Sequence, residues 1–162
     1  MSEVCFSCGG VFAAAPAGTT HVYMAASPGC WGAYTAVLAR EYQDAALFSR
    51  CHRLTVDAYA VQHPGDPDDR RARQSFWIHG ASLWMVVQMG RSHRAATAAL
   101  KTLAAGEFPV PPAPPRFALT TADVLAAHGS QHEAAVRAWA EATLADCAQA
   151  HAQFEMLALR VS

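Results

Sequence analysis

The sequence predicts an all-α fold, a helical bundle preceded by a long N-terminal loop. Alanine is abundant in the chain, and it has the highest helix propensity of all residues. Apolar residues recur at helical spacing from residue 30 onwards, whereas residues 1–29 contain glycine, proline and cysteine without such a period. The chain has 162 residues, of which 52% are hydrophobic, so it suits a single domain, 1–162, with a substantial core.

The first two helices are expected to form an antiparallel hairpin. The first covers about residues 30–42, and after a short link the second runs to His63, where a Pro-Gly pair ends it. Short links join antiparallel neighbours. Folding the hairpin places Cys30 beside residues 58–63, so the N-terminal loop, Cys30 and the end of the second helix should meet in space.

Two more helices are expected before the chain reaches its proline-rich part. Asp66 followed by proline is a strong start signal, because it puts a capping side chain before proline at the first helical position. This third helix is expected to reach Met89, and it is apolar almost all round, which marks it as a central, buried helix with His79 in its middle. An alanine-rich fourth helix is expected over residues 95–105.

The segment that follows the four helices of residues 30–105 cannot continue as a helix. Prolines crowd the stretch 107–119, so it is expected to be an extended, semi-rigid strap that crosses the bundle. The C-terminal helices then occupy residues 121–160. They comprise a short helix and one long last helix, which begins at a capping box formed by Ser130 and Glu133.

Composition restricts the compartment and the partners. The formal net charge is −1 and no basic run is present, which argues against nucleic acid as a partner. The N-terminus does not resemble a signal peptide, and no apolar run reaches the roughly 18 residues of a membrane span. We therefore expect a cytoplasmic protein without a membrane partner, in which the five cysteines are thiols or metal ligands.

The sharpest local signal is Cys5-x-x-Cys8 followed by two glycines. Such a turn, or knuckle, aims both sulfurs at one point, and glycine lets backbone amides face the thiolates. Zinc is the default metal for soft thiolates in the cytosol. A redox pair normally opens a helix, so a metal is favoured over a redox pair or a surface thiol pair. The predicted fold is thus an all-α helical bundle with a zinc-binding N-terminal loop.

A single cysteine pair supplies only half of a metal site. The other ligands must come from His21, Cys30, His52 or His63. Cys30 is the best third ligand, because it follows a Ser-Pro-Gly turn at the start of a helix. For the fourth ligand His21 is preferred, and His63 ranks next on the hairpin argument. The metal would hold the long loop against the helices.

A second group of polar side chains lies on the helices: His52, Asp57, His63, His79 and His132. Three helices each present a histidine, and bundle cores often hold metals in this way, so a second transition metal is a candidate. Asp57 could be a ligand, a general base or the group that orients a histidine, and Tyr59 could donate a proton. The alternative is a set of hydrogen-bonded core histidines, with Asp57 paired to Arg53.

These motifs resemble a family of small bacterial proteins of unknown function. The similar runs are Cys5-x-x-Cys8-Gly, His21-x-Tyr, Ser-Pro-Gly-Cys30-Trp, the whole of residues 52–65, and Ser75-x-x-x-His79. The resemblance spans nearly the whole chain and implies a family motif with these members: Cys5, Cys8, His21, Cys30, His52, Asp57, Tyr59, Gln62, His63 and His79. The architecture is also similar to DinB-like metal-dependent bundles, in which histidines from separate helices hold one metal.

The leading functional prediction is a metal-dependent enzyme, of the hydrolase or lyase type, that acts on a small molecule. Its pocket would lie between the second helix, the His79 helix and the start of the last helix. Asp57 or His63 would act as the base, and Tyr59 or Gln62 would position the substrate. The alternative is a non-catalytic module that senses a metal or a thiol state and docks a partner protein. A zinc-stabilised scaffold without a ligand is a third interpretation.

Overall fold

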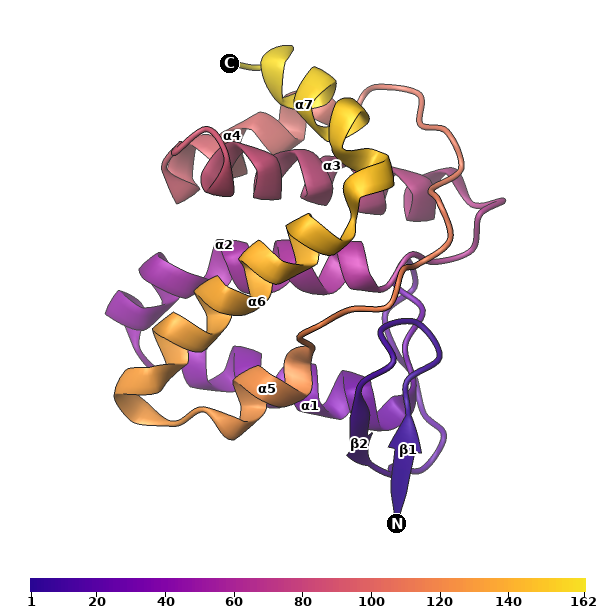
Figure 1. Cartoon of the computed structure of the whole chain (residues 1–162), viewed down its shortest axis with the longest axis vertical. Helices are drawn as coiled ribbons and strands as arrows, with labels where there is room; N and C mark the ends of the chain where they lie inside the picture. Colours follow the sequence, from indigo (N-terminus) through magenta and orange to yellow (C-terminus); the bar gives the residue numbers. More distant parts are fainter.

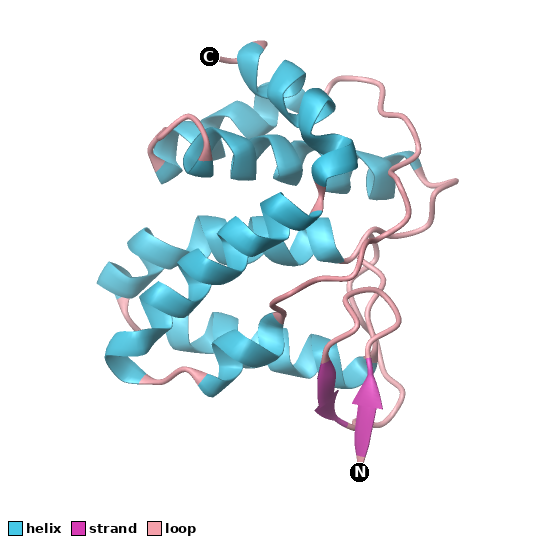
Figure 2. Ribbon diagram, viewed as in Figure 1, coloured by secondary structure: helices cyan, strands magenta, loops and turns pink.

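The computed structural model describes all 162 residues and is mostly helical, with one small sheet (Figure 1 and Figure 2). The helices are α1 (Pro28–Tyr42), α2 (Ala45–Gln62), α3 (Arg70–Val87), α4 (His93–Leu103), α5 (Thr121–Ala126), α6 (His132–Asp146) and α7 (His151–Leu159). Strands β1 (Ser2–Val4) and β2 (Val11–Ala13) pair antiparallel at the N-terminus. The prediction of a helical bundle is confirmed, and the N-terminal segment, expected to be mainly loop, contains the small sheet.

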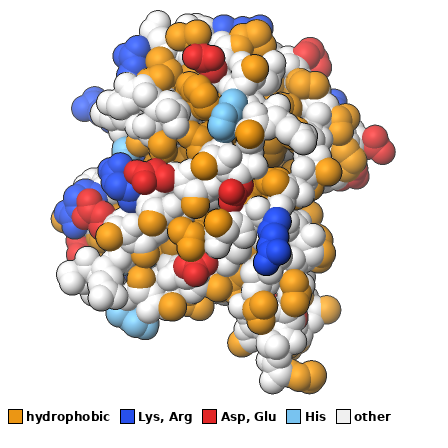
Figure 3. All heavy atoms as spheres, viewed as in Figure 1, with side chains coloured by type: hydrophobic (Ala, Val, Ile, Leu, Met, Phe, Trp, Pro, Cys, Tyr) orange, Lys and Arg blue, Asp and Glu red, His pale blue; other side chains and the backbone are white.

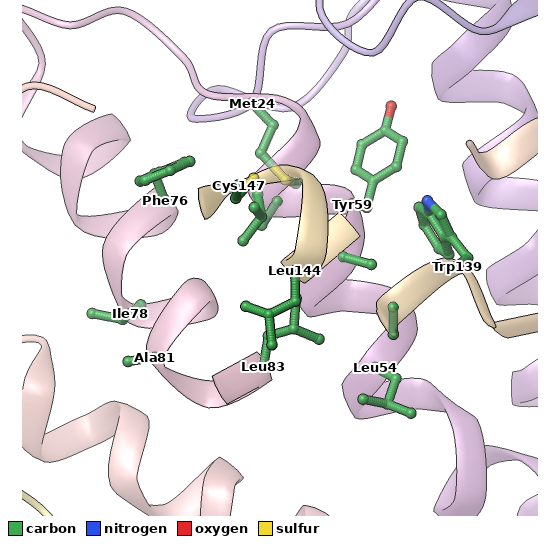
Figure 4. Packing of buried hydrophobic residues seen from close by; sticks show 14 of the residues in the cluster. Met24, Leu54, Tyr59, Phe76, Ile78, Ala81, Leu83, Trp139, Leu144 and Cys147 are labelled. Atoms are coloured by element: carbon green, nitrogen blue, oxygen red, sulfur yellow. The ribbon is translucent and has the colours of Figure 1, made fainter. Parts of the chain in front are cut away.

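Helix α2 is the centre of the bundle, because α1, α3 and α6 all pack against it (Figure 1). Large side chains from these helices are buried together, including Leu54 and Tyr59 of α2, Leu83 of α3, and Trp139 and Leu144 of α6 (Figure 4). Burying such side chains stabilises the fold by about 1.5–3 kcal/mol each. The same helix therefore carries both the core and most of the chemically interesting residues.

The hairpin of α1 and α2 forms where the sequence predicts it. Ser27 caps α1 by accepting a hydrogen bond from the Cys30 amide, and Asp44 caps α2 by accepting from Ala46 and Leu47. Helix α2 ends at Gln62, so His63 is its C-terminal cap residue. The hairpin thus brings the first turn of α1 next to the last turn of α2.

The third helix begins three residues later than predicted, at Arg70 rather than at Pro67. Asp69 is the cap, because its side chain accepts a hydrogen bond from Arg71. Asp66 instead accepts from the Asp68 amide and so stabilises a turn before the helix. Both Asp66 and Asp69 are suitable capping residues, and Asp69 is the one that caps α3.

The long last helix that the sequence predicts is divided into two helices, α6 and α7. A 3₁₀ turn at Ala148–Ala150 separates α6 from α7, and α7 then packs against α3. The break lets the Phe154 ring lie against Gly80, where any Cβ would clash with it. His151 Nε2 donates to the Leu144 carbonyl at 2.6 Å, which satisfies an acceptor at the end of α6. The tertiary contact therefore overrides the helical pattern of the sequence.

The predicted capping box of Ser130 and Glu133 is also absent. Helix α6 follows a 3₁₀ turn at Gly129–Gln131 and has no side-chain cap. Glu133 instead accepts a hydrogen bond from Arg50 Nε at 2.7 Å. A capping box does form at the start of α5, between Thr120 and Asp123.

The proline-rich stretch runs as an extended strap from α4 to α5, along one side of the bundle (Figure 1). It is fixed by side chains of α3: Trp77 Nε1 donates to the Pro109 carbonyl at 2.7 Å, and Arg73 Nε donates to the Phe108 carbonyl at 2.9 Å. These bonds hold the strap on the bundle without giving it regular structure.

The surface combines all classes of side chain. Figure 3 shows acidic, basic and apolar side chains interspersed on one face of the molecule. No helix combines the length and the apolar character that crossing a membrane requires.

Candidate metal centre and adjacent cleft

Four side chains converge where the N-terminal segment meets the helix hairpin: Cys5, Cys8, Cys30 and His63. Their ligand atoms all lie within 4.8 Å of one another. Each of the four residues is buried, with exposed fractions between 0% and 3%. Four convergent donors from three separate segments are the arrangement expected of a metal centre rather than of ordinary packing.

The distances fit tetrahedral coordination. Cys8 Sγ lies 3.9 Å from Cys30 Sγ, and Cys30 Sγ lies 3.2 Å from His63 Nε2. In a tetrahedral site with metal–sulfur bonds of about 2.3 Å and metal–nitrogen bonds of about 2.0 Å, the corresponding edges are about 3.8 and 3.5 Å. All the cysteines are free thiols, so no disulfide competes for these sulfurs.

The N-terminal turn presents Cys5 and Cys8 as a knuckle. The Gly9 amide donates to the Cys5 carbonyl and the Cys5 amide donates to the Gly10 carbonyl, each at 2.9 Å. Gly9 has a φ of 74°, a left-handed conformation that favours glycine. The Gly10 amide then points at Cys8 Sγ, at 3.4 Å. The glycines therefore set both the turn and a hydrogen bond to the sulfur.

The orientation of His63 is fixed by its own helix. Its Nδ1 lies 2.7 Å from the Tyr59 carbonyl, which can only accept, so Nδ1 carries the hydrogen. The lone pair on Nε2 therefore faces the three sulfurs, as a metal ligand requires. The Tyr59 ring stacks on the His63 ring with centroids 3.9 Å apart, and its hydroxyl lies 3.5 Å from Cys30 Sγ.

Hydrogen bonds among the three thiols shift their pKa values in opposite directions. Hydrogen bonds from Cys30 and Cys8 lower the pKa of Cys5, and the same contact with Cys5 raises the pKa of Cys30. The hydrogen bond from Cys30 favours the Cys8 thiolate, but Cys5 and burial outweigh it and raise the pKa of Cys8 to about 12. Ionisation is thus favoured at Cys5 and opposed at Cys8 and Cys30. The donor set therefore fits a divalent ion that stabilises several thiolates at once.

His21, the preferred fourth ligand, does not join this cluster, and His63 takes its place. His21 Nδ1 accepts a hydrogen bond from the Tyr23 amide at 3.1 Å, and its ring packs near Trp31. A backbone bridge between Met24 and Pro64 brings the loop past the end of α2. His21 precedes this bridge in the chain and is not among the clustered ligands.

A cleft of about 710 Å³ opens beside the metal centre, between α1, α2, α3 and the loop that carries His21. It was predicted to include the start of the last helix, but no residue of α6 lines it. Its walls are aromatic and apolar, and its polar lining is mainly cationic or neutral, with His21, His52, His79, Arg70 and Arg71 among its members. No aspartate or glutamate lines the cleft.

Within the cleft, His79 is held by a buried carboxylate. His79 Nδ1 lies 2.7 Å from Asp57 Oδ1. Arg53 and Ser82 donate to the same carboxylate, at distances between 2.5 and 3.0 Å. Arg53 Nη2 also lies 3.1 Å from His79 Nδ1, but both nitrogens are donors that converge on Asp57, because a carboxylate can only accept. This leaves Nε2 of His79 as the free ring nitrogen.

Asp57 is an orienting group in this arrangement rather than an accessible base. Its side chain is completely buried and both of its oxygens accept hydrogen bonds. Burial opposes its ionisation, but the charge of Arg53 and the hydrogen bond from His79 outweigh burial and keep the pKa of Asp57 below its ordinary value. The predicted pairing of Asp57 with Arg53 is therefore present together with its contact to His79.

Three further residues with predicted catalytic roles do not reach the cleft. Tyr59, Gln62 and His63 are completely buried and are absent from its lining. Gln62 Nε2 donates to the Leu119 carbonyl and to Thr143 Oγ1, each at 2.8 Å, so it joins α2 to the C-terminal part. Of the five residues assigned to catalysis, only His79 faces the open space.

The four histidines proposed for a second metal do not meet at one point. His63 belongs to the sulfur cluster and His79 contacts Asp57. His52 and His132 both contact Glu41, a residue outside the predicted group. Glu41 lies on the buried face of α1. In the sequence, the only indication of this buried carboxylate is a charged residue at an apolar position of the helix. The group thus divides into separate clusters, and neither His52 nor His79 approaches the sulfurs.

The match to known families covers most of the chain. Residues 3–148 match a family of unknown function, DUF5946. The chain belongs to this family. The resemblance drawn from the sequence motifs is thereby confirmed. No curated protein and no solved structure is detectably similar to this member of DUF5946. The functional argument therefore depends on the site itself.

Proposed function

We propose that this DUF5946 protein is a small acid–base enzyme, of the hydrolase or lyase type, with a structural zinc ion. Its substrate would be a small anionic molecule bound in the cleft. The observation that carries the proposal is His79, which Asp57 orients from behind and which faces a cleft without acidic side chains. An imidazole oriented by a carboxylate is the usual form of a protein general acid or base at neutral pH.

The metal supports the fold in this proposal and takes no part in the reaction. Structural zinc sites have four protein ligands, whereas catalytic sites keep one position open for water or substrate. Here Cys5, Cys8, Cys30 and His63 supply four donors, all of them buried. Zinc, when bound, would supply the coordination bonds that join the N-terminal hairpin to α1 and α2.

The lining of the cleft favours an anion with an apolar body. Arg70 and Arg71 stand on its α3 wall, and the Tyr23 hydroxyl holds one Arg71 nitrogen at 2.7 Å. Trp31 and Tyr34 offer aromatic surface on the α1 wall. A negatively charged substrate would meet no acidic side chain on entry, and cationic groups in a cleft raise the local concentration of anions.

His79 would then move a proton at its Nε2 atom. Its imidazole is partly exposed, and its Nδ1 atom is occupied by Asp57. His21 is close enough to His79 for the two to influence each other, because burial and then the neighbouring His79 lower the pKa of His21. His79, oriented by the Asp57 carboxylate, would accept the proton, and a neutral His21 would be able to bind the substrate.

The alternative, a thiol-sensing module that docks a partner, draws support from one distance. Cys8 and Cys30 sulfurs lie 3.9 Å apart, so release of the metal would leave two thiols near enough for an oxidant to join them. Oxidants reach exposed thiolates most readily, however, and Cys5 and Cys30 are completely buried. The enzyme is therefore the better-supported proposal.

The test is an activity screen of the zinc-loaded protein with small anionic esters, amides and phosphate monoesters. His79→Gln should lower kcat/KM for the best substrate by about 10²–10⁴, the usual contribution of a general acid or base. His128→Gln changes an exposed histidine away from the cleft and serves as the matched control. Turnover should also be the same when cobalt replaces zinc. An unchanged rate in His79→Gln, or a rate that follows the metal, would refute the proposal.

A further inference from the structure

A second cluster of potential ligands lies within the bundle, where α1, α2 and α6 meet. Glu41 of α1 is completely buried, yet no lysine or arginine forms an ion pair with it. Its neighbours are His52 Nδ1, 3.2 Å from Oε2, and His132 Nε2, 3.2 Å from Oε1. Thr55 Oγ1 also donates to Oε1, at 2.5 Å. A buried carboxylate needs a positive charge close by, because its desolvation is otherwise very costly.

Cys51 completes a set of three donors from three helices. A carboxylate oxygen of Glu41, Cys51 Sγ and a ring nitrogen of His132 all lie within 4.8 Å of one another, and all three residues are buried. Cys51 has no exposed surface, and no hydrogen bond to its sulfur is present. Packing alone does not explain why an unpartnered thiol should face a carboxylate and an imidazole.

We propose that Glu41, Cys51 and His132 bind a second transition-metal ion, of the borderline-soft class to which zinc and cobalt belong. Oxygen, sulfur and nitrogen donors together favour such an ion over calcium or magnesium, which prefer oxygen alone. Its positive charge balances the buried Glu41. His52 holds the second oxygen of that carboxylate and so orients it, while the same imidazole lines the cleft.

The other buried carboxylate of the bundle shows what a satisfied ion pair looks like in this chain. Asp57 receives two hydrogen bonds from Arg53, the shorter at 2.5 Å, and another from His79 at 2.7 Å. Hydrogen bonds between charged groups are typically about 2.7–2.9 Å long. Both imidazole contacts of Glu41 are longer, at 3.2 Å. This spacing leaves the donors near a common centre without a strong bond between them.

The site would join the α1–α2 hairpin to α6, as the sulfur cluster joins it to the N-terminal segment. Glu41, Cys51 and His132 are all buried from solvent. The ion would therefore bind during folding or when the helices open locally. This inference does not depend on the proposed enzyme, because a second structural metal is compatible with either function.

The test is the metal content of the full chain after equilibration with excess zinc and removal of free metal. The wild type should hold two ions per chain, and Cys51→Ala should hold one. Cys147→Ala is the matched control, because Cys147 is another buried free thiol but belongs to neither ligand cluster, and it should keep two ions. Two ions retained in Cys51→Ala, or one ion in the wild type, would overturn the proposal.

A measurement on the unaltered protein covers the case in which the variant does not fold. Cadmium NMR of the cadmium-loaded wild type should show two resonances, one from a site rich in sulfur and one from a site with a single sulfur. In cobalt-loaded protein, Cys51→Ala should remove part of the sulfur-to-cobalt charge-transfer absorption, and Cys147→Ala should not change it. In the cadmium experiment, a single resonance would contradict the second site. This result would not depend on the outcome of the activity screen.

Discussion

The candidate metal centre and the cleft share α1 and α2 but have opposite character, and the cleft also uses α3. The centre lies at the end of α2, where four buried donors surround a small closed volume. The cleft is open, and its polar lining is cationic or neutral, without an acidic side chain. A closed shell of soft ligands suits a permanent ion, whereas an open cationic space suits an anion that comes and goes. Helix α2 thus ends beside one candidate ligand, His63, and contributes His52 and Val56 to the cleft lining along its length.

Aromatic rings connect the two regions. Tyr34, which lines the cleft, stacks on Tyr59 with ring centroids 3.7 Å apart, and Tyr59 stacks on His63 of the metal centre. Loss of the metal should therefore reach the cleft wall through Tyr59.

The largest effect is expected from removing the metal centre. Cys30→Ala should abolish binding of one zinc and unfold the N-terminal segment, because structural zinc supplies about 10 kcal/mol or more of binding free energy in small zinc domains. Cys147→Ala removes another buried thiol and should change stability far less. Denaturant unfolding and metal analysis measure both effects. A Cys30→Ala protein as stable as Cys147→Ala would show that the cluster does not hold the fold together.

The next largest effect is expected at the base of the cleft. Asp57→Asn leaves Arg53 without its carboxylate partner, which should lower the free energy of unfolding by about 3–5 kcal/mol. The variant should keep the zinc of the sulfur cluster, because Asp57 contacts none of its ligands. Loss of that zinc in Asp57→Asn would contradict the division between centre and cleft.

The stability difference between the wild type and Asp57→Asn should depend on pH. The folded-state pKa of Asp57 lies below its ordinary value of 3.8, so the carboxylate contributes stability above that pH and loses it as the pH falls through the folded-state value. The difference in unfolding free energy between wild type and Asp57→Asn should therefore shrink when the pH falls below 3.8. A difference that stays constant on acidification would argue against an ionised Asp57.

Replacement of His79 should separate activity from stability. His79→Gln keeps a polar side chain at a partly exposed position but removes the imidazole hydrogen bond to Asp57, so the free energy of unfolding should fall by about 1.5–3 kcal/mol. The expected loss of activity in the same variant corresponds to about 2.7–5.5 kcal/mol of transition-state stabilisation. Thermal unfolding measured beside the activity screen gives both quantities. A large loss of stability in this variant would identify His79 as a core residue instead.

The smallest effect is expected for the link between the two regions. Tyr59→Phe keeps the stacked ring and removes only the hydroxyl near Cys30, so the free energy of unfolding should fall by about 1 kcal/mol. Zinc stoichiometry should stay unchanged. Metal loss in Tyr59→Phe would mean that the hydroxyl, and not the four ligands alone, holds the centre together.

The local signals in the sequence are enough to predict the helices of the hairpin, the turn that carries Cys5 and Cys8, and the position of Cys30 at the start of α1. These features depend on short-range chemistry such as capping and glycine turns. The choice between His21 and His63 depended on the path of a loop without periodicity, which local pattern cannot fix. The hairpin argument did point to His63, because it used long-range geometry.

The interior contacts were harder to predict for the same reason. Asp57 faces the interior only because α3 brings His79 and Ser82 to it. The break between α6 and α7 likewise follows from the contact of Phe154 with Gly80. Glu41 carried a weak signal, a charge within an apolar stripe, and its partner His132 is 91 residues away. Such pairings arise from the packing of distant segments.

X-ray absorption spectroscopy at the zinc edge tests the central claim most directly, and the Cys51→Ala variant restricts the signal to the N-terminal centre. The account predicts three sulfur atoms at about 2.3 Å, one nitrogen at about 2.0 Å, and no change when anions are added. A coordinated water or other oxygen ligand in place of a sulfur or of the histidine, especially one that an added anion displaces, would contradict it. The metal would then belong to the reaction, and the closed centre and the open cleft would be one site.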